Sequence, residues 1–301
     1  MSARIDSSVV PTLFVREILE RGIRLLAESG IEDPRVDAEL VVGHVLDASR
    51  GQVQAMAITG RELSVQDAAS ISVALARRSG REPLQHILGV AHFRSLELRV
   101  GPGVFVPRPE TEFVAGLAID ALLSMALGGS AGLGPIGIDL GTGSGAIALA
   151  MATEVAHARV IAVENSEAAF VWTRQNFKSI NAANARLVFA DLAVALPELN
   201  GQVSVVISNP PYIPLGAIPR DPEVRLFDPD HALYGGVDGL DIVRQVSRTG
   251  LRLLHAGGAL ILEHGELQGM AIRELLESDG WRAAATHRDL TGRDRATTAV
   301  R

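Results

Sequence analysis

The chain has 301 residues, 47% of them hydrophobic, and a formal net charge of −7. This length allows one large domain or two unequal ones. The absence of cysteine excludes disulfides, a thiolate nucleophile and a cysteine-based metal site. The lack of a basic block argues against duplex nucleic-acid binding, because neutralising phosphates needs clustered Lys or Arg.

No targeting or membrane-spanning segment is predicted, and we expect a soluble, cytoplasmic protein with no membrane partner. The opening segment MSARIDSSVV lacks an apolar core of signal-peptide length. No uninterrupted apolar run approaches the roughly 18 residues of a membrane helix. The most apolar stretch, 113–127, contains Asp120 and predicts a buried amphipathic helix.

Residues 1–80 predict a small all-helical domain. Apolar residues recur at the helical period, and helices are predicted over 12–29, 37–46 and 64–78. Ser64 followed by Asp67 resembles a capping box. This domain contains no recognisable chemical motif, so binding a partner and packing on the larger domain both remain open as its role.

Residues 81–109 are predicted to form an extended or hairpin connector. The segment HFRSLELRV, 92–100, alternates like a strand, and GPGVFVPRP, 101–109, is rich in turn formers. The adjoining Val106–Glu112 combines proline and charge, which is typical both of a rigid wall beside a ligand and of a linker with a capped helix start.

From residue 110 to 301, helices and strands alternate, which predicts an α/β fold with a mainly parallel, doubly wound, Rossmann-like sheet. Strands are expected at 136–140, 159–163, 186–190, 203–207, 259–262, 281–287 and 296–300. Helices are expected at 110–127, from 145, at 167–180, 238–255 and 267–278. The last two strands have no helix between them, so a terminal antiparallel hairpin is predicted.

A glycine-rich loop lies between the first strand of this domain and its helix. It reads Asp139-Leu-Gly141-Thr142-Gly143-Ser144-Gly145-Ala146. Glycines allow a sharp turn and close approach of a ligand, and the helix N-terminus offers free N–H groups. Glu164, at the end of the next strand, can accept both hydroxyls of a ribose. The loop predicts a nucleoside cofactor, with NAD and S-adenosylmethionine both open at this point.

The segment Asn209-Pro210-Pro211-Tyr212 follows the fourth predicted strand and decides between these cofactors. A planar nitrogen is a poor nucleophile, because its lone pair is delocalised. The Asn209 side-chain oxygen and a rigid proline carbonyl can accept hydrogen bonds from it, and Tyr212 offers a flat face to the planar group. The pattern therefore predicts a methyltransferase that uses S-adenosylmethionine on an amide or amino nitrogen. A Pro-Pro turn is the structural alternative.

Two further cofactor contacts are expected. Asp191, which ends the third strand, is predicted to bind the adenine amino group, with Leu192 beside the ring, although a plain strand-end turn explains both. Asp139 is expected either to meet the cofactor's ammonium group or to be a buried acid satisfied by the backbone.

Other chemistry is not indicated. The eight histidines are scattered without metal-ligand spacing, so no metal site is expected. Gly128–Gly132 matches G-x-S-x-G but follows a helix, whereas a nucleophile elbow follows a strand. Glu263–Glu266 is interpreted as a structured strand end.

Five motifs in order resemble the HemK/PrmC family of protein-(glutamine-N5) methyltransferases. They are Arg81–Gly89 (REPLQHILG), Val106–Glu112 (VPRPETE), Asp139–Gly145 (DLGTGSG), Ser208–Tyr212 (SNPPY) and Leu262–Gly265 (LEHG). Asn-Pro-Pro-Tyr alone also occurs in DNA amino methyltransferases, whereas the combination is specific.

The resemblance implies a class I methyltransferase fold that binds S-adenosylmethionine. It also implies that the substrate is the glutamine of the Gly-Gly-Gln motif in class 1 release factors, docked with help from residues 1–80. Leu192 replaces an aromatic residue of some relatives, and Glu164 replaces the more frequent Asp. The alternatives are a ribosomal-protein glutamine methyltransferase, a DNA or RNA amino methyltransferase, and a non-catalytic module that binds S-adenosylmethionine.

Overall fold

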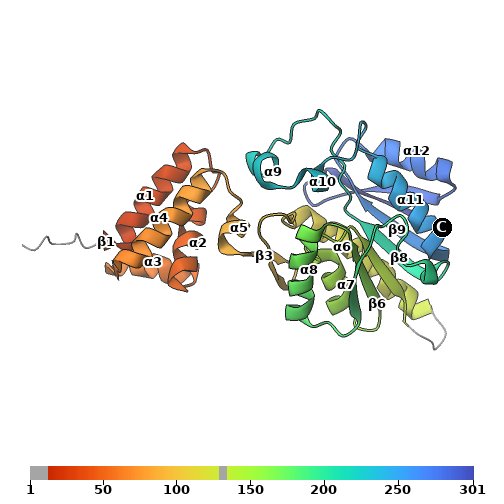
Figure 1. The fold of residues 1–301 in the computed structure, drawn as a ribbon, viewed down its shortest axis with the longest axis horizontal. Helices are drawn as coiled ribbons and strands as arrows, with labels where there is room; N and C mark the ends of the chain where they lie inside the picture. The colour runs from red at the N-terminus through yellow and green to blue at the C-terminus, as the bar shows by residue number, and fades with distance from the viewer. Residues whose placement is uncertain (1–12, 129–133) are drawn as a thin grey trace, which may run out of the picture. The chain divides into compact units, whose positions relative to one another are not determined.

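The structure is a computed structural model that describes residues 13–128 and 134–301. The chain divides into two compact units, with the boundary between Leu88 and Gly89 (Figure 1). The expected domain boundary at residue 80 therefore falls inside the first unit, and residues 81–88 of the expected connector belong to that unit. The G-x-S-x-G match at 128–132 extends outside the described residues.

The first unit is a bundle of helices around its own hydrophobic core. The helices are α1 (Val15–Glu28), α2 (Pro34–Leu46), α3 (Arg50–Thr59), α4 (Val65–Ser79) and the short α5 (Leu84–Leu88). Leu26, Val41 and Ile71 are fully buried where these helices meet. The bundle confirms the predicted helices, but α3, α5 and a two-residue strand pair, β1 (Leu13–Phe14) with β2 (Glu62–Leu63), were not predicted.

Side chains cap the first turns of α3 and α4 in this unit. Ser64 Oγ accepts a hydrogen bond from the Asp67 N–H at 3.0 Å and donates to the Asp67 carboxylate at 2.7 Å. The expected cap is present, but the Asp67 carboxylate bonds the Ser64 hydroxyl and not its backbone N–H. The reciprocal box occurs instead at α3, where Gln52 Oε1 accepts from the Ser49 N–H at 2.8 Å.

The predicted hairpin is part of the second unit. Strands β3 (Val90–Phe93) and β4 (Leu96–Arg99) pair antiparallel. Phe93 and Leu98 are buried in the same core as the large sheet, so the alternation seen in the sequence marks a buried face.

In the described part of the second unit, seven strands form one sheet in the order β10-β11-β9-β8-β5-β6-β7. Their bounds are β5 (Ile136–Leu140), β6 (Arg159–Glu164), β7 (Ala185–Phe189), β8 (Val203–Ser208), β9 (Leu254–Glu263), β10 (Arg282–Arg288) and β11 (Asp294–Val300). The strands β5 to β9 are parallel, whereas β11 is antiparallel to both β9 and β10. The mainly parallel sheet and its terminal hairpin are confirmed.

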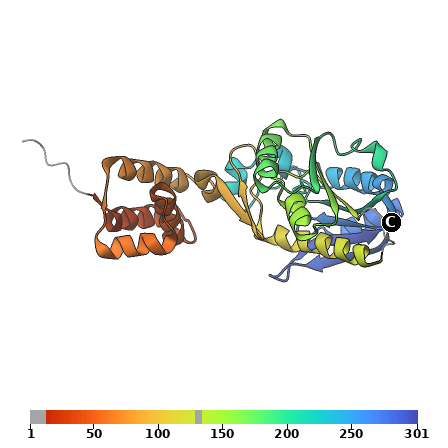
Figure 2. The same ribbon diagram turned by 90° about the horizontal axis from the view of Figure 1, so that it is seen from below.

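Helices cover both faces of this sheet (Figures 1 and 2). One face packs against α6 (Pro109–Gly128), α7 (Ala146–Glu154) and α8 (Glu167–Ile180), and the other against α11 (Asp241–Leu253) and α12 (Gly269–Asp279). Val205 and Val206 are both fully buried on opposite faces of β8. Burial on both sides explains why the strands read as continuous Val and Ile runs.

Three short helices of the second unit lie outside the predicted elements. They are η1 (Pro197–Leu199), α9 (Pro222–Phe227) and α10 (Asp230–Leu233). The last two follow the Asn-Pro-Pro-Tyr segment. Across the described residues, no helix combines the length and apolarity needed to cross a membrane.

The sheet order brings distant motifs together. β5 lies between β6 and β8, with Asp139 in register with Ala162 on one side and Ile207 on the other. Because parallel strands end at the same edge, the glycine loop, Glu164 and Asn209 meet at the carboxyl edge of the sheet.

Candidate active site

A cavity of about 1170 Å³ opens at the carboxyl ends of the parallel strands. The predicted site residues that line it are Gly141, Thr142, Gly143, Ser144, Glu164, Asp191, Leu192, Asn209, Pro210, Pro211 and Tyr212. Two other predicted residues, Asp139 and Gly145, are buried beside the loop and do not line the cavity. One cavity thus gathers nearly all the residues that the sequence singled out.

The glycine loop has a backbone that only glycine adopts readily. Gly141, Gly143 and Gly145 have φ values of +74°, +58° and +86°. The N–H groups of Gly141 and Thr142 donate to the Val163 carbonyl at 2.9 and 3.0 Å, which anchors the loop to the neighbouring strand. Gly145 ends the turn as the N-cap of α7.

The Glu164 carboxylate is held by three backbone donors. Its Oε2 accepts from the Gly143 N–H at 2.8 Å, and its Oε1 accepts from Asn165 N–H at 3.0 Å and Ser166 N–H at 2.8 Å. The side chain is buried apart from the part that lines the cavity. A fixed carboxylate beside the glycine loop can accept hydrogen bonds from a ribose without first being ordered.

Asp139 supports the loop from inside the protein. Its Oδ2 accepts from Thr142 Oγ1 at 2.5 Å and from the Ala148 N–H at 3.2 Å. Its Oδ1 has no hydrogen-bond partner among the described residues, and burial raises the pKa of Asp139 to about 7. The observed contacts join the loop to the first turn of α7, and contact with a cofactor ammonium stays a prediction.

Asp191 and Leu192 lie on the cavity wall where β7 leads into a turn. Asp191 Oδ1 accepts from the Ala193 N–H at 2.8 Å, as in a local turn. The side chain is exposed, and Leu192 is half-buried. Asp191 therefore forms a local turn and also lines the cavity, and its contact with adenine remains a prediction.

The Asn-Pro-Pro-Tyr segment leaves the end of β8. Ser208 Oγ donates to the Leu140 carbonyl at 2.6 Å, which fixes this strand end to β5. Asn209 Nδ2 donates to Thr111 Oγ1 at 3.5 Å, so the acceptor end of its amide is the end left for a ligand. The Tyr212 carbonyl accepts from Gln268 Nε2 at 2.9 Å. Burial is the largest cause that raises the pKa of Tyr212, and the charge of Glu263 is the second. The phenol therefore stays protonated.

An ion pair connects the Val106–Glu112 segment to the loop after α9. Arg108 Nη2 lies 3.0 Å from Asp228 Oδ2, and its guanidinium carbon lies 5.1 Å from the centre of the Phe105 ring. The Asp228 side chain is fully buried, which raises its pKa to about 6, while Arg108 opposes this shift. Arg108 also lines the cavity, so this segment forms part of the cavity wall.

Comparison with known proteins identifies the family. Residues 17–89 match the family profile described as PrmC N-terminal domain, and 122–219 match the Methyltransferase small domain. A release factor glutamine methyltransferase of Streptomyces coelicolor is 46% identical over 292 residues, covering 95% of this chain and 98% of that protein. The chain belongs to the release factor glutamine methyltransferase family. The resemblance seen in the five motifs is thereby confirmed.

Two other relatives and one solved structure are also similar to this chain. A release factor glutamine methyltransferase of Bifidobacterium longum is 40% identical, covering 96% of this chain and 100% of that protein. A 4-amino-L-phenylalanine/4-methylamino-L-phenylalanine methyltransferase of Streptomyces pristinaespiralis is 41% identical, covering 75% of each chain. The solved structure of a Pyrococcus furiosus methyltransferase, 20% identical with a TM-score of 0.50, covers 69% of this chain and 89% of that one and supports the fold alone.

The methyl donor of this enzyme family is S-adenosylmethionine, and the cavity fits it. Space is open in front of the loop, since a Cβ built at Gly141 or Gly143 would meet nothing within 4 Å. Glu164 offers the ribose a fixed acceptor, and Leu140 and Ile147 add apolar lining. Within the described ranges, no group of three His, Cys, Asp or Glu side chains is arranged to hold a metal ion.

Sequence reasoning missed four side chains at this site. Thr111 and Arg295 line the cavity, Gln268 bonds the Tyr212 carbonyl, and Glu263 is buried beside Asn209. Glu263 and His264 lie in the Leu262–Gly265 motif and in the segment Glu263–Glu266, which was interpreted as a structured strand end. The motif itself was the available signal, because an acid inside an apolar strand end has an energetic cost unless it is paired.

Proposed function

We propose that this protein transfers a methyl group from S-adenosylmethionine to the side-chain N5 of the glutamine in the Gly-Gly-Gln motif of class 1 release factors. The observation that carries the proposal is the orientation of Asn209, whose Nδ2 is bound to Thr111 while its oxygen is left as an acceptor at the cavity. Relatives named for this reaction cover nearly the whole chain.

Each part of the cavity has a role in this reaction. The glycine loop and Glu164 would hold the nucleoside of the cofactor, which when bound supplies an electrophilic methyl group on a sulfonium. Asn209 Oδ1 and the Pro210 carbonyl would accept hydrogen bonds from the two N–H groups of the glutamine amide, and Tyr212 would pack on its plane. These contacts orient the nitrogen lone pair toward the methyl group and raise its electron density.

The proton released on methylation needs no strong base. Once the nitrogen carries the methyl group, its N–H becomes strongly acidic, and solvent at the cavity mouth can accept the proton. The Tyr212 phenol, with its raised pKa, is protonated and does not serve as this base.

The N-terminal unit favours a protein as the substrate. It matches the PrmC N-terminal domain over 17–89, and none of the described residues that line the cavity comes from it. We assign it to docking the release factor, as expected for residues 1–80. This substrate also assigns the protein to the cytoplasm, where translation terminates.

The arylamine-methylating relative makes a small-molecule substrate the second candidate, because a planar amine has the same need for acceptors. The deciding experiment incubates the protein with labelled S-adenosylmethionine and, separately, a purified release factor, ribosomal proteins, duplex DNA and 4-amino-L-phenylalanine. Label should enter the release factor, and mass spectrometry should place it on the Gly-Gly-Gln glutamine. Label in the arylamine, DNA or ribosomal protein alone would refute the proposal.

A further inference from the structure

An asparagine that positions a substrate amide must itself be positioned. The two ends of its carboxamide have almost the same shape, but only one accepts a hydrogen bond. If the Asn209 amide turned by 180°, Nδ2 would face the substrate N–H groups and repel them. The contacts that hold Nδ2 therefore decide whether the site works.

Glu263 provides the second contact to this amide. It is the last residue of β9, 1% exposed, and is not among the described residues that line the cavity. β8 and β9 pair through Ser208 and Leu262, which sets Asn209 next to Glu263. The Thr111 and Asn209 side chains lie beside the Glu263 carboxylate and lower its pKa, and its Oε2 has no hydrogen-bond partner among the described residues. Asn209 Nδ2 donates to Thr111 Oγ1 at 3.5 Å, so the three side chains form a cluster beside the cavity.

The donors and acceptors of this cluster can be matched in one way. The Thr111 hydroxyl accepts one hydrogen from Asn209, which leaves its own hydrogen and the second Nδ2 hydrogen available to the Glu263 carboxylate. Both amide hydrogens are then used, and Oδ1 is left for the cavity. A carboxylate accepts only, so it excludes the turned amide, which would place two acceptors together.

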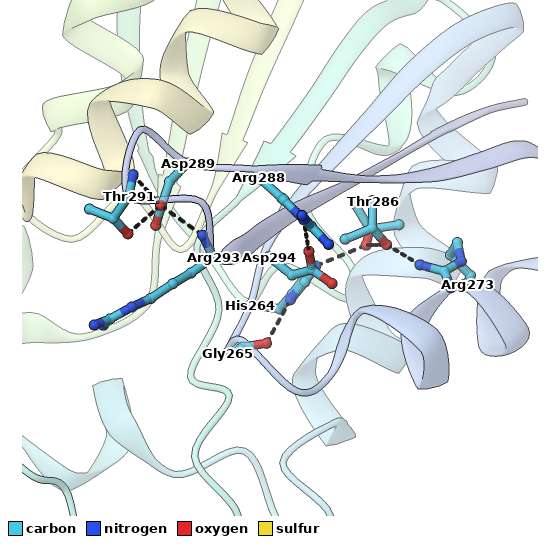
Figure 3. A network of polar contacts seen from close by, with 10 residues as sticks. His264, Gly265, Arg273, Thr286, Arg288, Asp289, Thr291, Arg293 and Asp294 are labelled. Atoms are coloured by element: carbon cyan, nitrogen blue, oxygen red, sulfur yellow. Dashed lines mark hydrogen bonds and ion pairs between the residues drawn. The ribbon is translucent and has the colours of Figure 1, made fainter.

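The surroundings of Glu263 hold it at one place. β11 pairs with β9 through Ala296 opposite Glu263, and the His264 N–H donates to the Arg295 carbonyl at 2.9 Å. Beyond Glu263, the His264 ring bonds the Gly265 carbonyl at 2.9 Å (Figure 3). Its other nitrogen bonds Thr297 Oγ1 at 2.9 Å.

The charges that face Glu263 come from two elements. Arg295 on β11 attracts its charge, and Glu110 on α6 repels it. Tyr212, in the segment after β8, stays neutral, as does His264, whose pKa is lowered by burial. Arg295 is itself paired with Asp289 at 3.1 Å, and Figure 3 shows Asp289 held within the turn between β10 and β11 by Thr291 and Arg293.

We propose that Glu263 is a positioning residue whose carboxylate, together with Thr111, binds Asn209 Nδ2 and so keeps Asn209 Oδ1 directed at the substrate nitrogen. This inference rests on the proposed function of Asn209. It assigns a task to a buried acid that the transfer itself does not use.

The proposal has a consequence for pH. Burial raises the pKa of Glu263 to about 7, with Thr111 and Arg295 opposing the shift. Below that pH the carboxyl gains a proton and becomes a donor as well, so the turned amide is no longer excluded. Turnover at saturating S-adenosylmethionine should therefore fall as the pH decreases through about 7. The cofactor is kept saturating because Asp139, which supports the glycine loop, also has a pKa of about 7.

The first test compares wild type with Glu263→Gln, which keeps the shape but has a donor end. We expect kcat for a purified release factor to fall about 10- to 100-fold at pH 8, the scale seen when a supporting hydrogen-bond partner is removed. The Kd for S-adenosylmethionine should stay within about threefold. The decline in kcat near pH 7 should be absent from Glu263→Gln, and Thr111→Ser should retain more activity than Thr111→Val.

The matched control is Glu274→Gln, an exposed acid on α12, which should leave kcat and its pH profile unchanged. Circular dichroism and cofactor affinity report whether each variant is folded. A Glu263→Gln enzyme with the wild-type kcat and the same pH profile overturns the inference.

A second measurement is independent of the substrate. In protein labelled with ¹⁵N-asparagine, the Asn209 NH₂ resonances, assigned with Asn209→Ala, should shift with a midpoint near pH 7 in wild type and not in Glu263→Gln. Wild type that methylates no release factor but shows this titration would refute the proposed function and leave the positioning role intact. Resonances without that titration in wild type overturn the inference in either case.

Discussion

Glu164 Oε2 accepts a hydrogen bond from the Gly143 N–H at 2.8 Å, so one carboxylate at the end of β6 supports the loop that follows β5. This acid therefore has two tasks, shaping the loop and offering an acceptor at the cavity. Glu164→Ala should weaken S-adenosylmethionine binding by about 1–3 kcal/mol, since charge-assisted hydrogen bonds are lost. Calorimetry on Glu164→Ala and on Glu164→Gln, which keeps an acceptor, should rank the losses in that order. Unchanged affinity in the alanine variant would remove Glu164 from the cofactor site.

Asn209→Ala should separate turnover from cofactor binding. The substitution removes the proposed acceptor but leaves the glycine loop and Glu164 in place. Loss of one preorganised polar contact typically costs about 10²–10³ in rate. We expect kcat on the release factor to fall by that factor, with affinity for S-adenosylmethionine within about tenfold of wild type. Near wild-type methylation by a variant shown to be folded by circular dichroism would assign the nitrogen's position to other groups.

Much of the fold could be predicted because the central strands β5 and β8 are fully buried. The runs at 136–140 and 203–207 are mostly apolar and buried at every residue, and they form β5 and most of β8. The short helices α9 and α10 could not be predicted, because a single turn has too few residues to show a period. α3 was missed although Ser49 and Gln52 form its capping box, because only one of its residues, Val53, is buried.

The parts of the site that lie in recognisable loop motifs could be predicted from the sequence. The parts that depend on which strands and helices are neighbours could not. The glycine loop and Asn209 follow strand ends directly, so their meeting at one edge follows from the parallel order. Glu263 and Thr111 contact Asn209 only because β9 lies beside β8 and α6 begins at Pro109 next to that edge. No spacing along the chain encodes that contact.

Gly235 allows the loop before α11 to pack on the backbone of the Asn-Pro-Pro-Tyr segment. A Cβ at this position would lie 2.3 Å from the Pro211 carbonyl oxygen. Gly235→Ala should therefore lower the free energy of unfolding by about 1–3 kcal/mol in urea denaturation, and should also reduce turnover. The matched control is Gly51→Ala on α3, where a Cβ meets nothing within 4 Å and stability should change by less than about 1 kcal/mol. Equal stability of both variants would contradict the close packing at Gly235.

Removing the cation of the Arg108–Asp228 ion pair should lower the free energy of unfolding by an amount that depends on pH. Arg108→Met leaves a buried carboxylate without its cation, which costs on the order of 3 kcal/mol of unfolding free energy when the acid is charged. Asp228 has a folded pKa of about 6, raised above its ordinary value, and losing Arg108 raises it further. The cost should therefore be largest at pH 8 and shrink at pH 5, where the acid is protonated. Adding Asp228→Asn to Arg108→Met should restore stability at pH 8, and a cost independent of pH would contradict this account.

Cofactor binding should need only the second compact unit, whereas docking of the substrate should need the first. A truncated chain of residues 89–301 retains the whole described cavity lining and both cores of the sheet. We expect it to bind S-adenosylmethionine within about tenfold of full-length affinity but to methylate intact release factor with a lower kcat/KM. Calorimetry and a labelled-methyl assay measure the two quantities. Equal efficiency on the release factor would exclude docking by the first unit.

The order of the strands also determines when the site can form. β5 and β8 are neighbours in the sheet, yet α7, β6, α8, β7 and η1 separate them along the chain. Pairing across such a separation carries a large loop-closure entropy, so it belongs to the later steps of folding. A nascent chain that ends before β8 already contains the glycine loop and Glu164, but its β5 has an unpaired edge that invites association with other strands. During synthesis, this enzyme thus passes through a stage with most of its cofactor-binding residues present and no pocket to assemble them.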